Sequence, residues 1–127
     1  MPIKIIAAAL SLLAATACAA KRRSIDFQPC AEDPTLQCGS LRVPLDYDDA
    51  AGAGIDLAVI RAPATGAGKR SGVLFINPGG PGASGFEIVL GGIHTPLGSR
   101  VRVYFDIVSF DPRGSNRSGA IPCDIGA

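Results

Sequence analysis

The 127-residue sequence has no tryptophan, one methionine, one histidine and four cysteines. One histidine beside scattered cysteines provides no ligand set for a transition metal, so the sequence gives no support for a metal site. Lysine and arginine number 12, aspartate and glutamate number 11, and the net charge of +1 argues against a nucleic-acid partner. The length leaves room for one small domain and excludes two.

Apolar residues are abundant. They make up 47% of the chain against 18% charged residues, and the mean hydropathy of +0.30 excludes a disordered chain. Lys4 precedes an apolar run over residues 5–17, small residues follow, and Lys21 opens a basic triplet. This order predicts a secretory signal peptide over residues 1–20. The run of about 13 residues is shorter than the roughly 20 of a membrane-spanning helix, so a retained anchor is the weaker interpretation.

Two cleavage patterns are open at the end of this segment. Ala17-Cys18-Ala19 fits an A-x-A cleavage site, whereas Ala15-Thr16-Ala17-Cys18 resembles a bacterial lipobox without its usual leucine. The second pattern would attach a lipid to Cys18, which is the only membrane contact that we expect. The mature protein is then secreted, periplasmic or lipid-anchored at the cell surface.

Export leads to an oxidising compartment, where cysteines pair. Cys30 and Cys38 flank a short loop, and this spacing favours a disulfide between them, with a bond to Cys123 as the alternative. If Cys30 and Cys38 pair, Cys123 is either a free buried thiol or bonds to a cysteine outside these residues.

The first part of the mature chain predicts a hairpin. Residues 24–37 are typical of a loop, and residues 41–45 and 55–60 are short, partly alternating apolar runs around an acidic turn with glycine. Pro44 cannot donate a ladder hydrogen bond, so it confines the first run to a sheet edge.

A βαβ unit is predicted next. Residues 73–76 form a continuous apolar run, as in a strand covered on both faces, and residues 86–90 open a helix that Gly91 and Gly92 cut short. Residues 101–110 form a second β-prone run. Strand, glycine loop, helix and strand in this order indicate parallel pairing, and the hairpin makes the sheet mixed, so the fold class is α/β.

The glycine loop formally matches the dinucleotide pattern G-x-G-x-x-G through Gly80, Gly82 and Gly85, and Asp106 follows about 20 residues later. Three features count against this interpretation. A hairpin precedes the loop, Pro81 has no N–H to offer a phosphate, and Asp106 lies inside its apolar run. A Walker A loop is excluded because no Lys-Ser or Lys-Thr closes the pattern.

A second interpretation is an oxyanion hole, in which backbone N–H groups stabilise the oxygen that becomes negative during acyl transfer. Pro78 and Pro81 cannot donate, so the candidate donors are the N–H groups of Gly79, Gly80 and Gly82, with Gly80 as first choice. A tight turn without chemistry is the alternative that glycine and proline clusters always leave open.

Three motifs carry a resemblance to a known family. Asn77-Pro-Gly-Gly-Pro-Gly82 looks like the HGGPG turn of the proline iminopeptidase and tripeptidyl aminopeptidase branch of the α/β-hydrolases, in its secreted NPGGPG form. Residues 105–118 resemble the strand and D-x-R-G-x-G-x-S turn that follow it, and residues 38–47 resemble the opening strand of secreted members. The resemblance covers about residues 30–123, and Asn116 departs from it where the family usually has glycine.

The resemblance implies an exported serine hydrolase, an aminopeptidase acting on short peptides or related amides and esters, with no cofactor. The sequence contains no G-x-S-x-G nucleophile elbow, since neither Ser84 nor Ser118 has glycine two residues away on both sides. His94 precedes any nucleophile, and we expect it on the surface. We therefore expect residues 21–127 to be the N-terminal portion of an α/β-hydrolase domain, incomplete and inactive alone.

The resembled fold orders its first strands 1-2-4-3, which would leave residues 73–76 as an exposed edge. An alternative from another class is a small exported binding protein or lipoprotein that holds an anion or nucleotide in the glycine loop. Asn116-Arg117-Ser118 fits a glycosylation sequon, but the lipobox-like start suggests a bacterial source, so we interpret it as turn chemistry.

Overall fold

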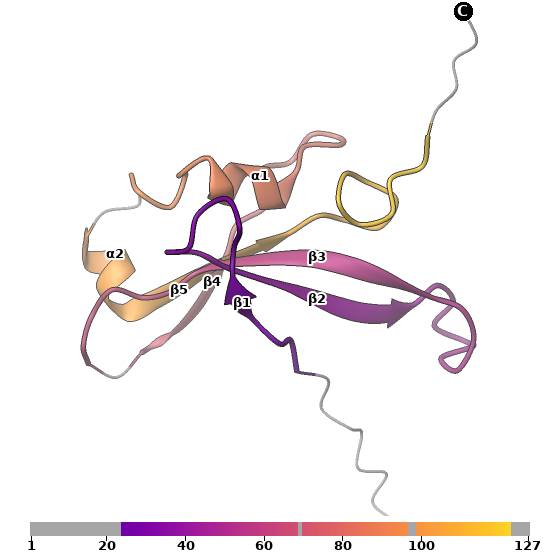
Figure 1. Cartoon of the computed structure of the whole chain (residues 1–127), viewed down its shortest axis with the longest axis horizontal. Coiled ribbons are helices and arrows are strands. Elements are labelled where there is room, and N and C mark those ends of the chain that lie inside the picture. The colour runs from indigo at the N-terminus through magenta and orange to yellow at the C-terminus, as the bar shows by residue number, and fades with distance from the viewer. Residues whose placement is uncertain (1–23, 69, 97–98, 123–127) are drawn as a thin grey trace, which may run out of the picture.

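The computed structural model describes residues 24–68, 70–96 and 99–122. The predicted signal peptide, Cys18 and Cys123 lie outside the described residues. In chain order the elements are β1 (Gln28–Pro29), β2 (Gln37–Pro44), β3 (Gly54–Ala62), β4 (Gly72–Phe75), α1 (Gly85–Leu90), α2 (Ser99–Tyr104) and β5 (Phe105–Phe110). The strands form one sheet in the order β1-β2-β3-β5-β4, and α1 lies over one of its faces (Figure 1).

The predicted hairpin is confirmed and is longer than expected. β2 and β3 pair antiparallel along the whole of β2, from Gln37 opposite Arg61 to Pro44 opposite Gly54. β1 pairs only with Gln37 and Cys38, so the remainder of β2 is a sheet edge. Pro44 therefore stands where a missing N–H costs no ladder bond, as the sequence predicted.

The predicted βαβ unit is also confirmed. β4 and β5 pair in parallel, from Gly72 opposite Phe105 to Phe75 opposite Val108, and α1 lies between them in the chain. β5 pairs antiparallel with β3 on its other side, which makes the sheet mixed. Without β1, the order β2-β3-β5-β4 is the 1-2-4-3 order expected from the resemblance.

The prediction of one strand over residues 101–110 was wrong in its first half, which forms α2. The strand can begin only where a neighbour offers ladder partners, and β4 begins at Gly72 opposite Phe105, while β3 ends at Ala62 opposite Ile107. Although the Thr65 and Ser71 N–H groups donate to the Arg102 and Tyr104 carbonyls, residues 101–104 belong to no ladder among the described residues. Their β-branched composition is overridden by this tertiary context.

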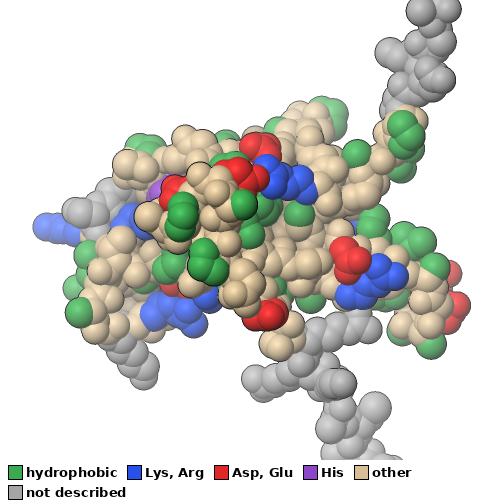
Figure 2. Space-filling view, viewed as in Figure 1, with side chains coloured by type: hydrophobic (Ala, Val, Ile, Leu, Met, Phe, Trp, Pro, Cys, Tyr) green, Lys and Arg blue, Asp and Glu red, His purple; other side chains and the backbone are tan. Residues whose placement is uncertain are grey.

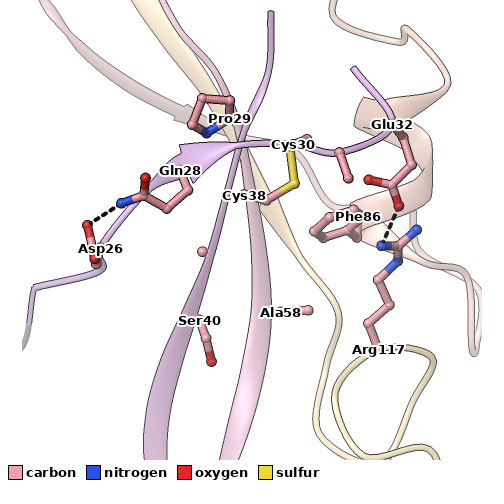
Figure 3. Close-up of a pocket in the computed structure, with 12 residues that line it drawn as sticks. Asp26, Gln28, Pro29, Cys30, Glu32, Cys38, Ser40, Ala58, Phe86 and Arg117 are labelled. Carbon is pink, nitrogen blue, oxygen red and sulfur yellow. Dashed lines mark hydrogen bonds and ion pairs between the residues drawn. A yellow bond between two sulfur atoms is a disulfide. The ribbon is translucent and has the colours of Figure 1, made fainter. Parts of the chain in front are cut away.

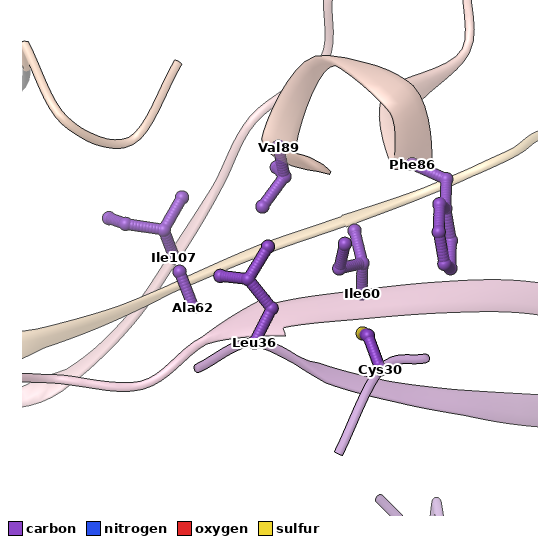
Figure 4. Close-up of a cluster of buried hydrophobic side chains, with 7 residues drawn as sticks. All are labelled: Cys30, Leu36, Ile60, Ala62, Phe86, Val89 and Ile107. Atoms are coloured by element: carbon purple, nitrogen blue, oxygen red, sulfur yellow. The ribbon is translucent and has the colours of Figure 1, made fainter. Parts of the chain in front are cut away.

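α1 packs the core against the sheet. Phe86 and Val89 point from the helix onto Ile60 and Ile107, and all four side chains are buried (Figure 4). Cys30, Leu36 and Ala62 complete the cluster. Full burial of a side chain of this size stabilises a fold by about 1.5–3 kcal/mol relative to exposure. This core fixes α1, and with it the glycine loop, relative to β5.

The predicted disulfide between Cys30 and Cys38 is present. It closes the loop that carries Leu36, and the Cys30 N–H donates to the Leu36 carbonyl at 3.0 Å. The bond ties the described N-terminal segment to β2. A disulfide is typical of proteins in oxidising compartments.

The opposite face of the sheet carries apolar side chains that no described helix covers. A cavity of about 200 Å³ there is lined by Ile25, Leu41, Leu57, Val59, Phe75, Val108 and Phe110. Along β4 the exposed fractions are 43% for Val73, 40% for Leu74 and 68% for Phe75. β4 therefore forms an exposed apolar edge, and its run is not covered on both faces as its composition had predicted.

Charged side chains stand singly or in small mixed groups on the face shown in Figure 2, without a continuous field of one sign. Within the part of the chain that the structure describes, no helix is long and apolar enough to cross a bilayer.

Candidate functional site

The glycine loop over residues 77–82 follows β4 and is largely exposed. Its first residue closes it, because Asn77 Oδ1 accepts a hydrogen bond from the Gly79 N–H at 3.0 Å. The φ angles of Gly79, Gly80 and Gly82 are 79°, 142° and 87°, in the range that favours glycine. The three glycines are therefore required by the path of the backbone.

The donors of this loop differ in their availability. The Gly79 N–H is engaged by Asn77, whereas the N–H groups of Gly80 and Gly82 have no acceptor among the described residues. A β-carbon at Gly80 would lie 2.7 Å from Gly82 N and 3.0 Å from Ala83 N. A side chain at Gly80 would therefore collide with the backbone of Gly82 and Ala83, so this position requires glycine.

Ser84 anchors the loop where it enters α1. Its Oγ accepts from the Glu87 N–H at 2.9 Å, which caps the helix, and donates to Asp111 Oδ1 at 2.6 Å. These two bonds engage the hydroxyl proton and one of the two acceptor sites of the oxygen. The end of the glycine loop is therefore held by a side chain that follows β5.

Asp111 is fully buried and holds two loops together. Besides Ser84 Oγ, its carboxylate accepts from the Phe86 N–H and the Arg117 N–H, both at 3.1 Å. Sequence reasoning placed Asp111 in a motif but gave it no role. The available signal was an aspartate directly after an apolar strand and before a proline–glycine turn.

Arg117 braces α1 from the outside, beside an open groove of about 550 Å³ (Figure 3). Its guanidinium stacks over Phe86 at 4.2 Å from the ring centre and donates to Glu87 Oε1 at 2.7 Å and to Glu32 Oε1 at 2.9 Å. The hydrogen bond from Arg117 lowers the pKa of Glu32, and Glu87 and Glu32 together raise the pKa of Arg117. Sequence reasoning did not find this cluster.

Asp106 does not lie where a dinucleotide-binding acid is needed. It pairs with Val73 near the start of β4, whereas the glycine loop follows the end of that strand. Its buried carboxylate bonds Arg70 Nη1 at 2.5 Å and accepts from the Ala64 N–H at 2.9 Å. Asp106 is thus part of an ion pair at the far end of the strand.

The other residues weighed as nucleophile or base are occupied. Ser118 is buried and its Oγ accepts from the Ala58 N–H at 2.9 Å, while the Ser84 hydroxyl is bound as described. His94 lies half-buried in the loop after α1, where Nδ1 donates to the Val89 carbonyl at 3.0 Å. The structure brings none of these side chains together as a triad.

Among residues 24–68, 70–96 and 99–122, no group of three or more histidine, cysteine, aspartate or glutamate side chains is arranged to hold a metal ion.

Curated proteins show a clear similarity to this chain, although no protein-family model matches it. It is 45% identical over 111 residues to "Serine protease Hip1" of Mycobacterium tuberculosis, which covers 81% of this chain and 21% of that protein. It is 40% identical over 116 residues to "Tripeptidyl aminopeptidase" of Streptomyces lividans, covering 87% and 22%. "Carboxylesterase B" of Mycobacterium tuberculosis is 45% identical over 84 residues, covering 66% and 16%.

The chain spans about a fifth of the length of these relatives. The 1-2-4-3 strand order and the loop after β4 agree with the resemblance that the motifs carry. The sequence similarity and the strand order lead to the same conclusion: the chain belongs to the α/β-hydrolase family of these serine proteases and aminopeptidases.

Proposed function

We propose that this chain is the N-terminal part of an exported serine hydrolase and that its glycine loop supplies an oxyanion hole. The observation that carries the proposal is the exposed turn after β4, in which the N–H groups of Gly80 and Gly82 have no acceptor among the described residues. Gly80 is the first candidate donor and Gly82 the second. Gly79 comes last because its N–H already binds Asn77.

A fixed geometry suits these donors to the chemistry. In acyl transfer the carbonyl oxygen becomes negative in a tetrahedral intermediate, and donors that need no rearrangement stabilise that charge best. Here Asn77 closes the start of the loop and the Ser84–Asp111 bond holds its end. The loop can therefore receive an oxyanion without reorganising.

The nucleophile, acid and histidine of such an enzyme would come from polypeptide beyond these 127 residues. The sequence contains no nucleophile elbow, and Ser84 and Ser118 spend their hydroxyls on structural bonds. His94 is bound to a helix carbonyl. We therefore propose that this chain alone does not catalyse hydrolysis.

The exposed edge of the sheet at β4 also supports the proposal that this chain is part of a larger hydrolase domain. An apolar edge strand in contact with water is a liability that proteins normally cover. Val73, Leu74 and Phe75 have no such cover among the described residues, and the face beside them is lined by apolar side chains. A further strand along β4 and packing on this face would complete the sheet.

We propose that the substrates are peptides, from whose N-termini the enzyme removes residues or short peptides. Related amides and esters form the wider substrate class. The relatives are called a serine protease, a carboxylesterase and a tripeptidyl aminopeptidase. Hydrolysis of a peptide or of an ester by a serine enzyme is in each case an acyl transfer. The disulfide and the signal-like start support export, either secreted, periplasmic or anchored through a lipid on Cys18.

A segment exchange tests this function. In the tripeptidyl aminopeptidase of Streptomyces lividans, the matched segment is replaced by the corresponding residues of this chain. We expect the folded chimera to hydrolyse a tripeptidyl arylamide, because the exchanged segment provides an equivalent oxyanion loop. A folded chimera without turnover would contradict the proposal.

The 127-residue chain alone is assayed in parallel, with arylamide and ester substrates and with a fluorophosphonate that labels activated serines. No turnover and no label are expected. Hydrolysis or labelling by the isolated chain would show that the nucleophile lies within it. A thermal transition raised by phosphate or a nucleotide would instead favour the anion-binding alternative.

A further inference from the structure

We propose that Asn116 is a positioning residue of the glycine loop, holding the Gly82 carbonyl and with it the orientation of the Gly82–Ala83 peptide next to Gly80. This inference rests on the proposed function. Asn116 lies in the turn after β5, at the position where the resembled family usually has glycine. The asparagine side chain thus makes a contact that the glycine of the resembled family cannot make.

The contact joins two loops that are distant in sequence. Asn116 Nδ2 donates to the Gly82 carbonyl oxygen at 3.2 Å. The loop after β4 and the turn after β5 meet here because parallel neighbours end at the same edge of a sheet. This bond holds the last residue of the glycine loop from outside it, since Asn77 acts within the loop and Ser84 binds only where the chain enters α1.

The backbone of Asn116 permits the replacement of glycine. Its φ is 43°, and among the described residues it is the one non-glycine residue with a positive φ. Asparagine tolerates this left-handed conformation better than most residues. The turn therefore keeps the path that glycine would give it and gains a side-chain amide that points to the loop.

Because a peptide group is planar, the hydrogen bond from Asn116 also sets the direction of the Ala83 N–H. The Gly82–Ala83 peptide is trans, so its carbonyl and its N–H point to opposite sides. Fixing the carbonyl toward Asn116 turns the Ala83 N–H away from it. Ala83 N and Gly82 N lie 3.0 Å and 2.7 Å from the position of a β-carbon on Gly80, so both nitrogens lie close to the proposed donor residue Gly80.

The effect of Asn116 is separable from the stability of the fold. Asp111 independently binds Ser84, the Phe86 N–H and the Arg117 N–H, so the start of α1 stays attached without Asn116. Loss of the Asn116 amide should therefore free the loop at Gly82 and leave the helix in place.

The test measures ¹⁵N relaxation of the 127-residue chain and of two variants. Asn116→Gly keeps the positive φ and removes the side chain, and Asn116→Asp keeps shape and turn preference but replaces the donor with a carboxylate. We expect order parameters of Gly82 and Ala83 near 0.85 in the parent chain and below about 0.6 in both variants, with faster amide exchange at Ala83. Val89 and Ile107 should not change.

Ser115→Ala is the matched control, because the Ser115 hydroxyl binds the Pro112 carbonyl in the same turn at 2.8 Å and, among the described residues, makes no hydrogen bond with the loop. It should leave Gly82 and Ala83 ordered. A parent loop as mobile as the variant loops, or an Asn116→Asp loop as ordered as the parent, would overturn the proposal. These outcomes differ from failure of the proposed function, which the segment exchange reports through turnover.

Discussion

At the scale of single residues, Asp111 joins the start of α1 to the turn after β5 through three hydrogen bonds. A buried carboxylate is costly unless hydrogen bonds replace its water, and here Ser84, Phe86 and Arg117 provide the donors. Asp111→Asn replaces one acceptor oxygen with an NH₂ group that faces donors. We expect a loss of about 1–3 kcal/mol in the free energy of unfolding, measured with urea.

The control for Asp111→Asn is Asp56→Asn, which breaks the ion pair of Asp56 with Arg42 at 2.7 Å on the exposed hairpin. Surface pairs contribute about 0–1 kcal/mol, so this variant should unfold at nearly the urea concentration of the parent. Equal losses in the two variants would show that Asp111 is not a special anchor.

The ion pair of Glu32 with Arg117 predicts that the stability of the fold depends on pH. Arg117 lowers the pKa of Glu32 below its ordinary value of 4.5, so the ionised form is favoured by folding. The stabilisation is present above about pH 4.5 and is lost as the pH falls through the folded pKa. Glu32→Gln should therefore reduce the fall in urea midpoint between pH 6 and pH 3. An unchanged fall would mean that the pair with Arg117 does not stabilise the fold.

Part of the site could be predicted at this scale and part could not. The donors Gly79, Gly80 and Gly82 follow from a strand, a glycine–proline cluster and a helix in sequence, although their role remains a prediction. The bond from the Gly79 N–H to Asn77 is a local Asx turn, whereas sequence alone could not tell that Asn116 reaches Gly82, because that contact depends on where two distant loops fold in space.

At the scale of elements, the hairpin, the helix and the parallel pair were predictable because each has a local signature. Apolar alternation and a glycine turn mark β2 and β3, and Gly91 ends α1 at Leu90. α2 was missed because its valines favour a strand, whereas the ladder with β4 begins only at Phe105 and the ladder with β3 only at Ile107.

Helix–strand contact at Gly85 gives an element-scale prediction. A β-carbon there would overlap the Phe110 carbonyl and the Ser109 hydroxyl, so α1 could not approach β5 as closely. Gly85→Ala should lower the free energy of unfolding by about 1–3 kcal/mol in a urea titration. Gly68→Ala is its control, because nothing lies within 4 Å of that position, and an equal loss there would refute the packing argument.

At the scale of the whole molecule, the bare edge of β4 predicts self-association of the isolated chain. Phe75 is 68% exposed on that edge, and a lysine there would oppose strand addition. Phe75→Lys should shift sedimentation toward monomer at equal concentration. Leu45→Lys changes a leucine that is 56% exposed in the distant hairpin turn and should leave association unaltered. If both variants behave alike, β4 is not the associating edge.

The central claim is that the turn after β4 stabilises an oxyanion for a nucleophile outside these residues. Its most direct test is kcat of the segment-exchange chimera carrying Gly80→Ala, since the φ of 142° disfavours a side chain and the added methyl would lie 2.7 Å from Gly82 N, which would move the loop amides out of position. We predict a fall in kcat of about 10²–10³-fold with little change in KM, and no fall for Gly68→Ala. An unchanged kcat in the folded Gly80→Ala chimera would contradict the account.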